Sequence, residues 1–263
     1  MADPSLRTAA SGMIAQQTRV DVIANNLANV NTTAFKRSRA HFEDLLYQTI
    51  QGTQLVGELD EGSLPAIQVG RGVRLAATPR VDTQGSFEPT GRALDVAIDG
   101  DGYFQVELPD GKNAFTRDGS FQLSPDGTLM TSSGYQLSPP ISFPTEVSEV
   151  VISRDGTVST RDAGSGDLLE VGRIELVRFP NSTGLIARGQ NLLLETEASG
   201  SPEVGMPEEE GFGRLVASTL ETSNVEIVQE MVDMIAAQRA YEIASKAVQT
   251  SEEMADVASN LFR

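Results

Sequence analysis

The sequence contains no cysteine and only one histidine, His41. Without cysteine there can be no disulfide, no thiolate metal site and no cysteine nucleophile. A Ser-His-Asp triad or a multi-histidine metal site would have to be built around His41 alone, and no nearby residues support either one. The sequence therefore predicts no catalytic residue, no metal site and no cofactor.

Long apolar segments and positive charge are also scarce. No run of about 18 apolar residues exists, so no membrane-spanning helix is predicted. The opening residues MADPSLRTAASGM lack a continuous apolar core and do not resemble a cleaved secretory signal. The 20 Lys and Arg against 37 Asp and Glu give a formal net charge of −17, which disfavours nucleic-acid or anionic-membrane partners.

Charge is nearly absent from a helical pattern at the N-terminus, where Arg19 and Asp21 are the only charged residues between Thr8 and Phe35. The outer face of the predicted helix, about residues 5–30, carries amides where a solvated helix would carry Lys and Glu. Amides tolerate burial against other protein better than charges do. The apolar spacing of three then four residues predicts a helix seam. Its repeating positions are Leu6, Met13, Val20 and Leu27, alternating with Ala9, Gln16, Ile23 and Val30.

A second long helix is predicted at the C-terminus. Ser223 and Glu226 have the spacing of a capping box, which predicts a helix start at residue 223. The helix carries two apolar stripes, which imply more than one neighbour. The first stripe contains Ile227, Met231, Met234, Gln238, Tyr241 and Val248, and the second contains Ala240, Ile243, Ala247, Met254, Val257 and Leu261.

The middle of the chain has a different pattern. Glycines and a proline between residues 52 and 72 predict an irregular or hairpin-like connector. From about residue 73, apolar and polar residues alternate in short runs, and Asp-Gly pairs at 110, 118 and 126 recur every eight residues as in tight turns. The predicted fold class is α+β: terminal helices forming a coiled-coil core domain, an irregular connector, and a central all-β domain of short antiparallel strands. The predicted boundaries are 1–32, 33–72, 73–222 and 223–263.

Several stretches resemble bacterial flagellar rod and hook proteins. The N-terminal ANNLAN (24–29) and its continuation to Lys36 resemble their N-terminal signature, and residues 221–250 resemble their C-terminal helix. DVAIDGDGYFQV (95–106) and FTRDGSFQLSPDGTL (115–129) resemble their β-domain motifs. FEDLLYQT (42–49) and the overall length are most similar to the distal rod subunits of the flagellar basal body.

The resemblance implies a structural subunit without enzymatic activity. It would self-assemble helically into the hollow distal rod, transmit torque and surround the export channel. Its partners would be copies of itself, adjoining proximal-rod and hook-side axial proteins, and the surrounding ring bushing. It would lie in the basal body at the periplasmic to outer-membrane level, exported by the flagellar type III apparatus without a cleaved signal.

The predicted self-assembly interface lies on the two terminal helices. The amide cluster near residue 25 is included because amides on neighbouring turns can bond across an interface. Two alternatives remain open: a hook or proximal-rod subunit, and a small β-rich hydrolase with helical oligomerisation arms, since paired carboxylates can come from distant strands. The predicted interface residues are Leu6, Met13, Val20, Ile23, Asn25, Asn26, Leu27, Asn29, Ile227, Met231, Met234, Tyr241, Val248, Met254 and Leu261.

Overall fold

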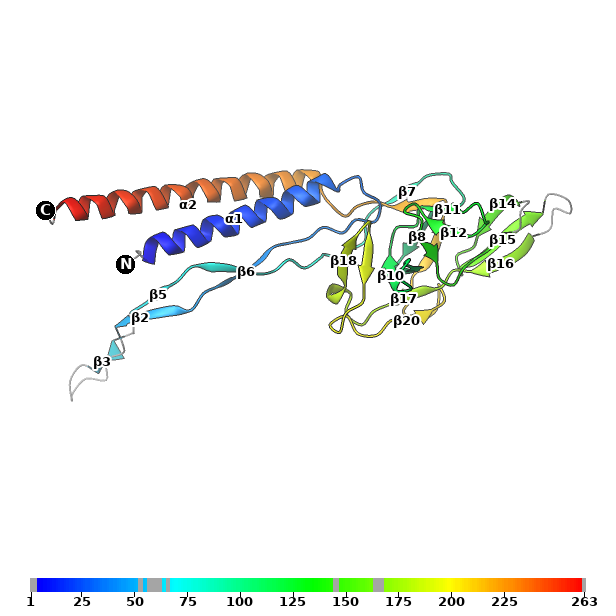
Figure 1. Cartoon of the computed structure of the whole chain (residues 1–263), viewed down its shortest axis with the longest axis horizontal. Coiled ribbons are helices and arrows are strands. Elements are labelled where there is room, and N and C mark those ends of the chain that lie inside the picture. The colour runs from blue at the N-terminus through cyan, green and yellow to red at the C-terminus, as the bar shows by residue number, and fades with distance from the viewer. Residues whose placement is uncertain are drawn as a thin grey trace. The chain divides into compact units, whose positions relative to one another are not determined.

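The computed structural model describes residues 4–51, 54–55, 63–64, 67–143, 147–162 and 168–261 (Figure 1). The chain folds into two compact units. The helical unit comprises Met1–Ala28, Ser38–Arg80 and Glu226–Arg263, and the β unit comprises Asn29–Arg37 and Val81–Val225. The chain therefore passes between the two units four times.

Two helices dominate the helical unit, and they lie side by side (Figure 1). Helix α1 spans Pro4–Ala28 and α2 spans Ile227–Leu261. Proline suits the first position of a helix because its missing N–H has no intrahelical partner there. The sequence of α2 contains neither glycine nor proline and is rich in alanine, glutamate and glutamine, which favour a long uninterrupted helix.

The predicted coiled-coil core is wrong. Strands account for 36% of the structure and helices for 25%, and the two helices do not form a long coiled-coil core. A coiled coil needs large apolar knobs at the positions that face the partner helix. In α2 the buried positions are instead Glu230, Ala237 and Ser251, which are polar or small. Most of its described large apolar side chains, including Ile227 and Met231, are exposed, and Met234 and Val248 are half-buried.

The sequence predicted an irregular or hairpin-like connector, and the described residues between 41 and 77 form antiparallel strand pairs. The strands at 41–44 and 73–77 bury little of their surface, so the alternation that marks a half-buried strand is weak there. The pairs are β1 (His41–Asp44) with β6 (Val73–Ala77), β2 (Tyr47–Gln51) with β5 (Ile67–Gly70), and β3 (Gln54–Leu55) with β4 (Ser63–Leu64).

The β unit contains a seven-stranded antiparallel sheet with the order β11-β12-β13-β9-β10-β19-β18. Asp110-Gly111 connects β9 to β10 and Asp126-Gly127 connects β11 to β12, both with glycine at positive φ, as the Asp-Gly spacing predicts. The strands are β9 (Phe104–Glu107), β10 (Asn113–Thr116), β11 (Phe121–Leu123), β12 (Leu129–Thr131), β13 (Gln136–Leu137), β18 (Ile186–Gly189) and β19 (Leu192–Leu194).

Smaller sheets complete the β unit. A three-stranded sheet has the order β14-β15-β16, and three strand pairs are β7 with β22, β8 with β21 and β17 with β20. A 3-10 turn, η1, spans Ser182–Gly184. The bounds are β7 (Phe87–Pro89), β8 (Val96–Asp99), β14 (Val147–Ile152), β15 (Thr157–Asp162), β16 (Leu168–Arg173), β17 (Leu176–Arg178), β20 (Glu203–Gly205), β21 (Arg214–Ala217) and β22 (Thr219–Glu221).

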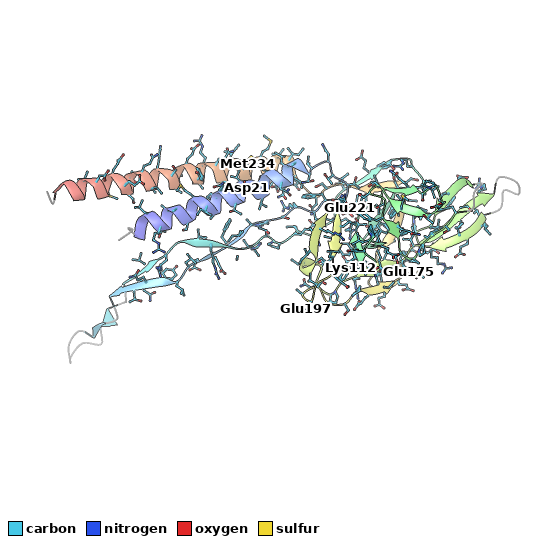
Figure 2. All side chains as sticks on the ribbon, in the orientation of Figure 1. Asp21, Lys112, Glu175, Glu197, Glu221 and Met234 are labelled. Carbon is cyan, nitrogen blue, oxygen red and sulfur yellow. The ribbon has the colours of Figure 1, made fainter. Side chains whose placement is uncertain are left out.

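The hydrophobic core lies in the β unit. Its main cluster includes Val96, Ile98, Phe104 and Phe121, each with no exposed surface. Phe104 and Phe121 pack edge to face, with ring centroids 5.0 Å apart. Charged side chains such as Lys112 and Glu197 are exposed on this unit (Figure 2).

Candidate functional site

Large apolar side chains are exposed along α2. Val228 is 77% exposed and Ile235 57%, which is unusual for side chains of this size in a helix that lies in a folded unit. Contiguous exposed apolar patches are typical of interaction surfaces. The exposed large hydrophobics of α2 are Ile227, Val228, Met231, Val232, Ile235, Tyr241, Ile243, Met254 and Val257.

The predicted interface residues fall into three groups in this single chain. Ile23 and Asn26 are buried inside the helical unit. The half-buried residues are Leu6, Met13, Val20, Leu27, Asn29, Met234 and Val248, and the exposed residues are Asn25, Ile227, Met231, Tyr241 and Met254. The side chain of Leu261 lies outside the described residues.

Asn26 connects three segments of the helical unit. Its side-chain Nδ2 donates to the Ser38 carbonyl at 2.9 Å, and its Oδ1 accepts from the Ser38 backbone N–H at 2.9 Å. Nδ2 also lies 3.1 Å from Oε2 of Glu230 on α2. Because Asn26 and Glu230 are both buried, these bonds satisfy groups that water cannot reach. Arg19 and Asp233 add an ion pair at 3.4 Å whose partly exposed side chains make it weak.

Ser11 joins α1 to strand β6. Its Oγ donates to the Thr8 carbonyl at 2.7 Å and accepts from the Val73 N–H at 3.2 Å. The neighbouring Gly72 has φ +108, and a Cβ at that position would overlap the Ser11 hydroxyl. Glycine is therefore required here for both its backbone conformation and its lack of a side chain.

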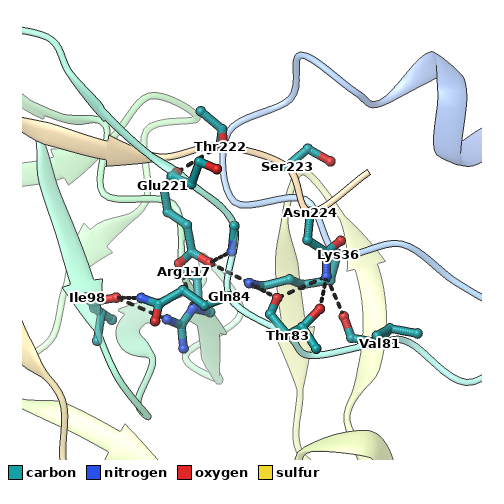
Figure 3. Close-up of polar contacts among 12 residues, drawn as sticks. Lys36, Val81, Thr83, Gln84, Ile98, Arg117, Glu221, Thr222, Ser223 and Asn224 are labelled. Atoms are coloured by element: carbon teal, nitrogen blue, oxygen red, sulfur yellow. Dashed lines mark hydrogen bonds and ion pairs between the residues drawn. The ribbon is translucent and has the colours of Figure 1, made fainter. Parts of the chain in front are cut away.

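The β unit contains a buried charge cluster formed by Lys36, Arg117 and Glu221 (Figure 3). Their side chains are 5%, 9% and 0% exposed, respectively. Arg117 Nε donates to Oε2 of Glu221 at 2.9 Å, while Lys36 Nζ pairs with Oε1. Oε1 also accepts from the Gly85 N–H at 2.9 Å, and Lys36 donates to the Thr83 carbonyl at 2.8 Å.

The cluster shifts the pKa of two of its members. Burial alone would raise the pKa of the Glu221 carboxyl, but the Arg117 charge and the Lys36 hydrogen bond and charge outweigh burial and lower it. Burial lowers the pKa of the Lys36 ammonium, although the hydrogen bond and charge of Glu221 oppose that effect. Glu221 is thus held as a carboxylate by two cations.

Asn224 holds neighbouring backbone segments of the β unit together (Figure 3). Its Oδ1 accepts from the Arg37 N–H at 2.8 Å, and its Nδ2 donates to the carbonyls of Val81 at 2.8 Å and Thr83 at 2.9 Å. The Asn224 backbone N–H donates to the Phe35 carbonyl. Residues 35–37, 81–83 and 224 are therefore cross-linked by one side chain and its backbone.

Sequence reasoning missed Lys36, Arg117, Glu221 and Asn224 as structural residues. A charged residue is ordinarily solvated, so nothing in a single sequence marks Glu221 as completely buried. The available signal for Lys36 was its place at the end of the resembling N-terminal stretch, in a region otherwise poor in charge.

The described residues show no group of three or more histidines or acids arranged to hold a metal ion. Neither described helix combines the length and hydropathy needed to cross a bilayer.

Comparison with known proteins decides the family. Residues 6–36 match the family model described as flagella basal body rod protein, 97–160 match the flagellar hook protein FlgE/F/G D1 domain, and 216–261 match the flagellar basal body rod FlgEFG protein C-terminal region. A flagellar basal-body rod protein FlgG of Borreliella burgdorferi is 51% identical over 98% of both chains. The chain belongs to the flagellar basal-body rod protein family.

Other relatives agree. The Bacillus subtilis flagellar basal-body rod protein FlgG is 40% identical over 98% of this chain and 99% of its own length. The Escherichia coli rod protein FlgF is 34% identical over 97% of this chain and 95% of its own length. The protein is accordingly a structural rod subunit of the flagellar basal body, from a family that assembles with other axial flagellar proteins.

Proposed function

We propose that this subunit builds the distal part of the rod. Copies assemble helically into a hollow tube that transmits torque and surrounds the export channel. The relatives named FlgG, which is the distal rod protein, reach 51% identity over nearly the whole chain, and this supports the distal assignment. The subunit has no catalytic role in this proposal.

The observation that carries the proposal is the exposed apolar stripe of α2, on a chain that aligns end to end with rod proteins. Burying such side chains between copies contributes roughly 25 cal/mol for each Å² of apolar surface removed from water. We propose that the exposed members of the predicted interface contact other copies directly, while Ile23 and Asn26 shape the helical unit that presents them. The neighbours are further copies, adjoining proximal-rod and hook-side proteins, and the ring bushing.

The proposal also places the subunit at the periplasmic to outer-membrane level of the basal body. We propose export through the flagellar type III apparatus without a cleaved signal.

The test is assembly in cells that produce one variant as the sole copy. Ile235→Glu places a charge in the exposed stripe, and isolated basal bodies are expected to end in a short rod, as in cells lacking the gene. Gln122→Glu adds the same charge at an exposed polar position of the β unit, outside the predicted interface, and is the control. It is expected to give rods of full length under the electron microscope. Full-length straight rods from Ile235→Glu would refute the proposed surface, and full-length rods without the gene would refute the distal assignment.

A further inference from the structure

The segment 29–37, which directly follows α1 in the chain, is attached to the β unit mainly by polar contacts. The Ala34 N–H donates to the Glu221 carbonyl at 2.8 Å, and the Val81 N–H donates to the Arg37 carbonyl at 2.8 Å. Asn191 Nδ2 donates to the Thr33 carbonyl at 3.0 Å. Together with the bonds of Lys36 and Asn224, these contacts hold the segment through hydrogen bonds and one ion pair, and Ala34 is its one buried apolar side chain.

The core of the β unit is complete without this segment. Among the residues that the structure describes, neither hydrophobic cluster of the β unit includes any member of 29–37. Regions with few buried apolar contacts open at lower free energy than the core around them. Within the segment, Ala34 also has a φ of 56°, a left-handed conformation that is unfavourable for alanine.

The site that receives Lys36 is held in place by other residues. Arg117 pairs with Oε2 of Glu221 and is itself fixed by the carbonyls of Ile98, Gly100 and Gly102 at 3.0–3.1 Å. The Gly85 N–H donates to Oε1. When Lys36 leaves, Glu221 therefore retains one cation and one backbone donor, so the buried carboxylate is not left unpaired.

We propose that residues 29–37 form a clasp that opens and recloses on the folded β unit, with Lys36 entering and leaving a preformed ammonium site made by Glu221 and the Thr83 carbonyl. Docking of the clasp is a step separate from folding of the β unit. The order of events is then set by the chain itself: the core and the Arg117–Glu221 pair form first, and the segment that leads to α1 docks afterwards. This holds whatever the position of the subunit in the rod.

Lysine labelling of the full-length protein tests the proposal, because the chain has only three lysines, Lys36, Lys112 and Lys246. Lys112 and Lys246 are exposed and serve as internal controls for reagent activity. Acetylation by a water-soluble N-hydroxysuccinimide acetate is followed by mass spectrometry across a series of urea concentrations below the unfolding transition. Amide exchange of Phe104 and Val106 in β9 reports global opening of the β unit in the same samples.

If the clasp opens separately, Lys36 is labelled at least tenfold faster than the opening of β9 allows. The opening free energy measured at Lys36 also changes less with urea concentration, because that slope scales with the surface exposed. Labelling of Lys36 with the same opening constant and the same slope as β9 would overturn the proposal.

Two variants at neighbouring positions distinguish opening of the clasp from opening of the β-unit core. Gln190 and Asn191 both have positive φ, at 55° and 59°, so glycine suits either backbone. Asn191→Gly removes only the side chain that bonds Thr33, and it is expected to raise Lys36 labelling about three- to tenfold with β9 exchange unchanged. Gln190→Gly instead removes a side chain that bonds the Tyr135 hydroxyl, and Lys36 labelling is expected to stay as in the wild type. Equal increases in both variants, or a parallel rise in β9 exchange, would also overturn the proposal.

Discussion

Lys36 and Glu221 are 185 residues apart in the sequence, and their side chains form an ion pair in the interior of the β unit. Arg117 binds the other oxygen of the same carboxylate. This one carboxylate is therefore the direct ion-pair partner of two buried cations, and its removal would break both pairs. The following predictions concern this cluster and two contacts in the helical unit.

Glu221→Gln is expected to lower the free energy of unfolding of the β unit by about 3–5 kcal/mol, because it breaks a buried ion cluster from one side. Urea denaturation followed by amide exchange of β9 measures the change. Glu203→Gln is the control, since Glu203 is 53% exposed in its pair with Arg178 and should change the free energy by at most about 1 kcal/mol. Equal losses in the two variants would contradict a special role for the cluster.

Glu221→Gln should also weaken the pH dependence of the free energy of unfolding at acid pH. The pKa of Glu221 is lower in the folded state than in the unfolded state. The ionised carboxylate therefore contributes fully to the free energy of unfolding above the unfolded-state pKa of about 4.3, and this contribution is lost as the pH falls through the folded-state pKa. The wild-type β unit should therefore lose stability from about pH 5 downward, with a steeper slope than Glu221→Gln. Asp155, whose pKa is lowered by hydrogen bonds from Thr157, is present in both proteins, so the difference isolates Glu221. Parallel profiles would contradict the prediction.

Gly72→Ala should destabilise the packing of β6 on α1 by about 2–4 kcal/mol, through its positive φ and the overlap with the Ser11 hydroxyl. Amide exchange of residues 73–77 measures the effect. Gly12→Ala in α1 is the control with the opposite expected sign, because its Cβ meets no atom within 4 Å and alanine favours a helix interior by up to about 1 kcal/mol. Adding Ser11→Ala to Gly72→Ala should restore part of the loss. No recovery in that double variant would exclude the hydroxyl as the cause.

Asn26→Ala should lower the free energy of unfolding of the helical unit by about 2–4 kcal/mol, because the buried Glu230 and the Ser38 backbone lose their hydrogen bonds to the Asn26 side chain. Asn26→Asp should be at least as harmful, since it sets a carboxylate against Glu230. Thermal unfolding followed by far-UV circular dichroism measures both. Gln17→Ala, at an exposed position of α1, should stay within about 0.5 kcal/mol of the wild type. A mild effect at Asn26 would show that the amide is replaceable.

The sequence correctly predicted those turns of the β unit that depend only on local backbone conformation. Gly111 and Gly127 have the positive φ expected of Asp-Gly turns. Gly119 does not, because its position is set by close approach to the Val96 carbonyl, which a Cβ would overlap. A local sequence pattern does not show a contact between distant segments, so the Asp118-Gly119 pair was misread as a turn.

Long-range contacts also explain the helix errors. Ser223 and Glu226 predicted a helix start at residue 223, but α2 begins at Ile227 because Asn224 bonds Phe35 and Arg37 instead of continuing a helix. The seven-residue repeat of α1 was correctly read as a helix. It could not reveal that the buried positions of α2 would include Glu230 and Ala237, while most of its large apolar side chains are exposed.

The sequence separation of Lys36 and Glu221 has a consequence during synthesis. A ribosome adds roughly 5–20 residues each second, so about 10–40 s pass between the appearance of the lysine and that of its carboxylate. Throughout that interval the ammonium group has only water or a transient companion. This ion pair therefore cannot form before residue 221 has been synthesised.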